Sequence, residues 1–211
     1  ASFAAGGGGV FPAITPTFDD NDLVTVSIGG NDARVYQRKG GTVAGAPPAA
    51  ATAVTSAQAN LDVLVAAGAP TISFLAGNTA LLPEIATDPA AQAVRNAYST
   101  AFNAGIQDVL AGYAANGVIV HYIDLTTMLQ QVSANLSAYG FTSAGPCAPV
   151  AQCLVNAYSS QFVFYVDALH PTSHTSAVIA QYIAVQLQAP LTLEAPSELG
   201  LDTARQFGRT L

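Results

Sequence analysis

Basic side chains are scarce in this chain of 211 residues, which contains 6 Lys and Arg against 13 Asp and Glu. Between Arg95 and Arg205 there is no lysine or arginine. Nucleic-acid binding needs clustered basic groups that neutralise phosphates, so a formal net charge of −7 argues against a nucleic-acid partner. Charged residues amount to 9% and hydrophobic types to 51%, which excludes a disordered chain. We expect one folded domain with a small or neutral partner.

Long uninterrupted hydrophobic runs are also absent. The stretch 63–83 carries no charge and is long enough to cross a bilayer, but Gly68 and Pro70 interrupt it and polar residues recur in it. A helix, a turn and a strand explain it better, so we predict no membrane span. No signal peptide is visible.

Only two cysteines occur, Cys147 and Cys153, in a segment rich in proline and alanine. No other cysteine or nearby histidine accompanies them, which makes them a poor metal site. Two alternatives remain, a disulfide in an exported protein or two reduced thiols in a cytosolic loop, and we favour the disulfide. Closing so small a loop contributes roughly 2.4 kcal/mol on the chain-entropy model.

Strand and helix patterns alternate along the sequence. β-branched or aromatic runs at 22–28, 71–75, 118–123 and 162–166 predict buried strands. Helices are predicted at 47–67, at 89–116 with Asp88 as N-cap, after the third strand up to 136, and at about 171–187. Strands joined by helices form a parallel sheet with helices on both faces, so we predict a three-layer α/β/α domain.

Ligands of such sheets bind beyond the carboxyl ends of the strands. The loop after the fourth strand holds Asp167 and His170, followed by Pro171. A carboxylate so placed can accept the imidazole N–H and leave the other ring nitrogen free as a base. The alternative is an aspartate that caps the next helix beside a surface histidine. His174 could join His170 as a metal ligand, but no glutamate accompanies them as in zinc hydrolases, and we predict no metal site.

A second loop at 29–32 reads Gly-Gly-Asn-Asp at the end of the first strand. Glycine lets the backbone approach a ligand, and the Asn31 amide is a neutral donor suited to a developing oxyanion. We expect Asp32 to hold this loop together, because Gly-Asn-Asp clusters also form ordinary turns. His121 lies within a predicted strand, and we expect it to be structural.

Together the two motifs resemble the GDSL or SGNH hydrolase family, over residues 1–188. The resemblance implies a flavodoxin-like α/β/α fold and hydrolysis of carboxylic esters through an acyl-enzyme, without a metal or organic cofactor. It makes Asn31 an oxyanion donor, His170 the general base and Asp167 its orienting partner. The glycine run 6–9 resembles the family's glycine block, which makes Gly7 a second oxyanion donor.

The tail, residues 189–211, is similar to the segment that joins surface-displayed esterase domains to an autotransporter β-barrel. This similarity implies a linker or appendage after the domain, and a secreted protein or one displayed at the cell surface.

The family's nucleophile, the serine of a Gly-Asp-Ser-Leu block, is not found in the sequence. Ser2 has no strand before it and Ser27 lies inside a predicted strand, so we expect neither to act. We predict that residues 1–188 form a hydrolase domain without its N-terminal nucleophile block, and that a companion N-terminal segment completes the sheet beside the strand at 22–28. The substrate would be a small-molecule or lipid ester. Two alternatives stay open: a non-catalytic surface domain on a hydrolase scaffold, and a carbohydrate deacetylase of the same family.

Overall fold

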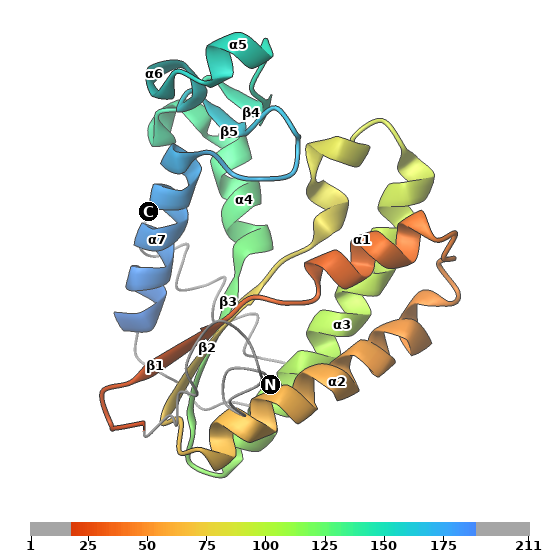
Figure 1. Ribbon diagram of the computed structural model, residues 1–211, viewed down its shortest axis with the longest axis vertical. Helices are drawn as coiled ribbons and strands as arrows, with labels where there is room; N and C mark the ends of the chain where they lie inside the picture. Colours follow the sequence, from red (N-terminus) through yellow and green to blue (C-terminus); the bar gives the residue numbers. More distant parts are fainter. Residues whose placement is uncertain (1–17, 189–211) are drawn as a thin grey trace, which may run out of the picture.

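Parallel strands alternate with helices (Figure 1), and the computed structural model describes residues 18–188. The strands are β1 (Leu23–Val26), β2 (Thr71–Ala76), β3 (Ile119–Asp124), β4 (Ser143–Pro146) and β5 (Phe162–Phe164). The α-helices are α1 (Gly30–Arg38), α2 (Ala46–Ala66), α3 (Pro89–Ala115), α4 (Leu125–Ala134), α5 (Val150–Cys153), α6 (Asn156–Ser159) and α7 (Ser173–Gln188). The 3₁₀ helices are η1 (Thr79–Leu81), η2 (Pro83–Ile85) and η3 (Leu136–Tyr139). The predicted alternation is confirmed, whereas α1 and β4 lie where the sequence predicted loops.

The described strands form two separate sheets. The larger has the order β1-β2-β3 and is parallel, and the smaller pairs β4 with β5, also in parallel. The expectation that the run 162–166 joins the main sheet is therefore wrong. That run is apolar for another reason, because Val163 and Phe164 pack with Val132 and Phe141 in a core of their own.

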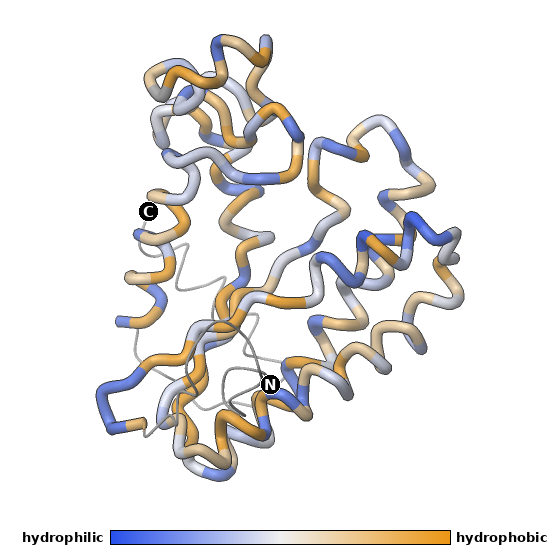
Figure 2. The backbone as a smooth tube through the Cα atoms, in the orientation of Figure 1, coloured by the Kyte–Doolittle hydropathy of each residue, from blue (hydrophilic) through white to orange (hydrophobic). Residues whose placement is uncertain are grey.

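Helices cover both faces of the three-stranded sheet, which confirms the predicted three layers (Figure 1). On one face, α2 and α3 enclose a core that includes Ile72, Phe74 and Ile106, all fully buried. On the other face, α4 and α7 pack over a second core that contains Ile123 and Tyr182. Burying one such side chain stabilises the fold by about 1.5–3 kcal/mol. Figure 2 shows these strands as largely hydrophobic segments.

Among residues 18–188, β1 pairs with β2 only. Its other side therefore carries N–H and C=O groups that no described strand pairs with, which makes β1 an edge strand. At its carboxyl end, Gly29 has a φ of +93° and turns the chain directly into α1. A side chain at Gly29 would overlap the ring of Phe102, so glycine is required there.

The predicted loop at 29–32 is consequently the start of a helix. Because Gly29 turns the chain in one residue, α1 begins at Gly30, and Asn31 and Asp32 lie in its first turn. The predicted N-cap of α3 is confirmed, since the Asp88 carboxylate accepts the Ala91 N–H at 2.9 Å. The strand predicted at 22–28 ends at Val26, so the expectation that Ser27 lies inside a strand is wrong. Ser27 is exposed in the connection to α1.

The two cysteines are paired as expected: Cys147 and Cys153 form a disulfide with a Cα–Cα distance of 5.8 Å, and both are buried. His174 has a structural role, because its Nε2 lies 2.7 Å from the Tyr139 carbonyl and its ring meets that of Phe141 edge-on. His121 is buried in β3, and burial lowers its pKa.

Some predicted features lie outside the described residues, namely Ser2, Gly7 and the tail 189–211. Within the described part, no helix combines the length and the apolar character that a membrane crossing requires.

Candidate active site

Asp167 and His170 form a hydrogen-bonded pair in the loop between β5 and α7. The carboxylate Oδ2 lies 2.6 Å from Nδ1 of His170, while Oδ1 accepts the backbone N–H groups of Leu169 and His170 at 3.0 and 2.9 Å. One of the two residues between them, Ala168, has a φ of 57°, in the left-handed region that residues other than glycine rarely adopt. The tight turn therefore brings the carboxylate and the imidazole within hydrogen-bonding distance of each other.

The electrostatics of this pair suit a base and its orienting group. The side-chain hydrogen bond to His170, together with the two backbone N–H groups, lowers the pKa of Asp167 to about 2 although burial opposes this. The carboxylate is therefore ionised at neutral pH. The His170 side chain is 69% exposed, and its Nε2 has no hydrogen-bond partner among residues 18–188. An imidazole held through Nδ1 in this way can take a proton at Nε2.

Asn31 and His170 line the same open cleft, whose volume is about 400 Å³. Asn31 is exposed in the first turn of α1, where backbone N–H groups have no partner within the helix. The helix N-terminus adds a positive potential there. Asn31, at a helix N-terminus, and His170 thus line one cleft, and groups of these kinds can donate to an oxyanion and accept a proton, respectively.

The family model of GDSL-like lipases and acylhydrolases matches residues 10–183 of the sequence. The chain belongs to this family. A search of the curated proteins finds no match. The matched range contains the Gly29–Gly30 turn and the Asp167–His170 pair.

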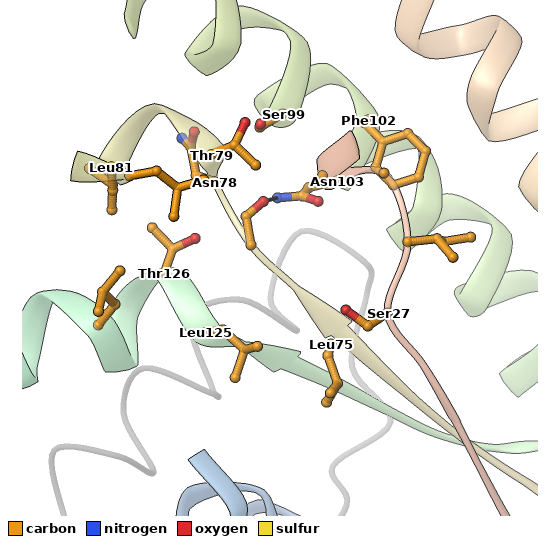
Figure 3. Close-up of a pocket in the computed structure, with 16 residues that line it drawn as sticks. Ser27, Leu75, Asn78, Thr79, Leu81, Ser99, Phe102, Asn103, Leu125 and Thr126 are labelled. Carbon is orange, nitrogen blue, oxygen red and sulfur yellow. Dashed lines mark hydrogen bonds between the residues drawn. The ribbon is translucent and has the colours of Figure 1, made fainter. Parts of the chain in front are cut away.

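A second, more apolar cavity of about 170 Å³ adjoins the cleft in this GDSL-family fold. It lies beyond the carboxyl ends of all three strands of the main sheet, and Figure 3 shows Leu75, Leu125 and Phe102 around it. Two of the lining residues are hydrogen-bonded to each other, since the Asn103 amide donates to the Gly77 carbonyl at 3.2 Å. The cavity and the cleft share Ser27 to Gly30, Thr79 and Leu82 as lining, so they border on each other.

Two of the shared residues carry hydroxyl groups, Ser27 and Thr79. Ser27 is exposed in the connection from β1 to α1, which is the segment that also delivers Asn31. The Thr79 hydroxyl is buried without a hydrogen-bond partner in the described structure. Asp32 also lines the cleft, but its carboxylate accepts no hydrogen bond from the described residues, so the structure does not support its expected role of holding the turn together.

A partly buried ion cluster, which borders the cleft through Arg34, was not predicted. The Glu84 carboxylate accepts from Nε and Nη2 of Arg34, both at 2.9 Å, and also pairs with Arg38 and Arg95. The Arg95 side chain is 1% exposed and donates to Gln37 through Nε and Nη2 at 3.2 and 3.0 Å. Burial would raise the pKa of Glu84, but the bonds from Arg34 and Arg95 outweigh it and lower the pKa.

Half of the six basic residues of the chain converge on this one carboxylate. The partners lie 46 and 50 positions apart in sequence from Glu84 for Arg38 and Arg34, so no local pattern reveals them.

Proposed function

We propose that this chain supplies the acid–base pair and the oxyanion donor of a serine hydrolase that cleaves carboxylic esters through an acyl-enzyme. The observation that carries the proposal is the 2.6 Å contact between Asp167 and His170 in the same cleft as Asn31. In this mechanism His170 Nε2 accepts the proton of a serine hydroxyl as its oxygen attacks the ester carbonyl. The Asn31 amide donates to the oxyanion, and Gly7 would add a backbone N–H.

Collapse of the tetrahedral intermediate expels the alcohol, which takes its proton from the imidazolium of His170. Water then attacks the acyl-enzyme by the same route, with His170 again accepting the proton, and this releases the carboxylic acid and the free serine. Asp167 stays ionised throughout and stabilises the imidazolium, in keeping with its lowered pKa. No step requires a metal ion or an organic cofactor.

The nucleophilic serine would come from a segment that pairs with the open edge of β1. Two features support this part of the proposal. The edge of β1 has no partner among the described strands, and the carboxyl end of a parallel strand added there would lie next to the turn that carries Asn31. Ser27 is the only described serine that lines the cleft with His170, so it is the alternative nucleophile that a labelling experiment has to exclude.

The adjoining apolar cavity favours an acyl chain over a sugar acetate as the group that the enzyme removes. Leu75, Leu82 and Leu125 offer apolar contact surface to an acyl chain. Polar side chains also line this cavity, but the Asn78 and Asn103 amides already donate to other groups of the protein. We therefore propose an esterase of the lipase type, and the deacetylase becomes an outcome of the test. The disulfide agrees with folding in an oxidising compartment, which supports a secreted or surface-displayed protein.

The test compares His170→Ala with His174→Gln in a preparation that hydrolyses p-nitrophenyl butyrate. His174→Gln removes a second imidazole outside the cleft, and the new amide can still donate to the Tyr139 carbonyl. We expect turnover to fall at least about 10³-fold in the first variant and to stay unchanged in the second. Unchanged turnover in His170→Ala would overturn the proposal, and a preference for acetylated sugars over butyrate would favour the deacetylase.

A further inference from the structure

Glu84 contacts both segments that build the proposed site. Its carboxylate holds Arg34 in α1, the helix whose first turn carries Asn31. Its backbone N–H donates to the carbonyl of Ala168 at 3.2 Å, between Asp167 and His170. In Figure 1 the loop that follows β5 reaches toward the yellow segment that contains Glu84. The two walls of the cleft therefore meet at one residue.

The Asp167–His170 turn needs such a support. Both side chains are exposed, and Ala168 has the uncommon left-handed conformation, which persists only where neighbouring groups fix it. Within the loop, backbone bonds join Ala168 to Tyr165 and Tyr165 to His170, and the Asp167 carboxylate accepts two further backbone N–H groups. The bond from Glu84 reaches the turn from outside the loop. Of these bonds, only that from Glu84 connects the turn to the α1 side of the cleft.

Glu84 is itself held rigidly. Arg95 is buried in α3 and binds Glu84 and Gln37 at once, so its guanidinium bridges η2 and α1. Arg34 adds a two-pronged contact whose planar geometry fixes the carboxylate in orientation as well as in distance. A group this constrained can transmit position to the loop that it contacts.

We propose that Glu84 is a positioning residue that fixes the Asp167–His170 pair relative to Asn31. This inference rests on the proposed function. Glu84 touches no reacting atom. Through its carboxylate it locates α1, and through its N–H it locates the turn of the pair, so both walls of the cleft keep one spacing. The competing explanation is an ion cluster that stabilises the fold and has no influence on the pair.

The test follows the Asp167 carboxyl carbon by NMR while the pH of the isotopically labelled full chain is lowered. We compare the wild type with Glu84→Gln and Glu84→Asp, and use Asp62→Asn as a matched control. Asp62 is also a carboxylate that accepts from a buried side chain, Tyr113, at 2.7 Å, but it lies near the end of α2 that leads into β2. The measurement needs no ester hydrolysis, so its result stands whether or not the proposed function holds.

We expect the titration midpoint of Asp167 to rise by about one pH unit in Glu84→Gln, less in Glu84→Asp, and not at all in Asp62→Asn. A rise shows that the hydrogen-bond geometry of the Asp167–His170 pair has been lost. Removing the negative charge of Glu84 would by itself leave Arg34 less neutralised and lower the Asp167 midpoint further. The amide proton shifts of Leu169 and His170 should move in the same variants. If Glu84→Gln fails to fold, the result for Glu84→Asp tests the inference by itself, since this variant keeps the negative charge but has a side chain one methylene shorter.

In a preparation that hydrolyses p-nitrophenyl butyrate, Glu84→Gln should lower kcat by about 10-fold to 10²-fold with KM changed less than about twofold. Variants that unfold more easily but keep the wild-type Asp167 midpoint and the wild-type amide shifts would overturn the inference and leave Glu84 a purely stabilising residue.

Discussion

Replacing Arg95 by Met tests the energetic importance of the ion cluster. The substitution keeps much of the buried volume but removes one charged bond to Glu84 and two bonds to the Gln37 amide oxygen. Removing one partner of a buried ion pair costs about 3–5 kcal/mol, because the other partner stays buried and unpaired. Since Glu84 keeps its contacts with Arg34, we expect the lower end, about 3 kcal/mol.

Urea unfolding followed by circular dichroism measures this change. With an m-value of about 2 kcal/mol/M, a loss of 3 kcal/mol lowers the midpoint by about 1.5 M. For a domain of this size the melting temperature should fall by about 6–12 °C. Arg38→Met is the matched control: it removes the same charge from the same carboxylate, but its side chain is 57% exposed, so we expect less than about 0.5 kcal/mol. Equal effects of the two substitutions would refute the reasoning that burial decides the contribution.

Three further predictions concern the site and the loop that carries the disulfide. Asn31→Ala should lower kcat for ester hydrolysis by about 10²–10³, as loss of an oxyanion donor does, and wild-type kcat in a folded variant would exclude this role. Asp167 has a pKa lowered to about 2 by its bond to His170, so its contribution to stability is present above an unfolded pKa of about 3.9 and is lost as the pH falls through the folded value. Asp167→Asn should therefore flatten the free energy of unfolding against pH between about 4 and 2, and an unchanged slope would contradict the pairing. Replacing Cys147 and Cys153 by Ser should lower the free energy of unfolding by roughly 2.4 kcal/mol, whereas no change would mean that the loop closes without the disulfide.

The elements with regular patterns were predictable from the sequence. The β-branched run before Gly29 and the Asp88-Pro89 cap each depend on local geometry, and both recur in the structure. The pairing of Asp167 with His170 was predictable for the same reason, because a turn of three residues brings the two side chains together.

Features that depend on distant partners were not predictable. The run 162–166 has the composition of a central strand, and nothing local shows that β5 pairs with β4 instead of the main sheet. The start of α1 was missed because Gly-Gly-Asn-Asp favours a turn locally, whereas the fit of Gly29 against Phe102 depends on α3. The role of Glu84 likewise requires knowing which arginines surround it.

The central claim is that the acid–base pair of this chain activates a serine presented beside β1. The most direct test treats a preparation that hydrolyses p-nitrophenyl butyrate with a fluorophosphonate, which labels activated serines covalently, and locates the label by peptide mass spectrometry. We predict a label on a serine outside residues 18–188, and its loss in His170→Ala. A label on Ser27 would contradict the claim. Ser27 directly follows β1 itself and does not lie on a separate segment that pairs beside it.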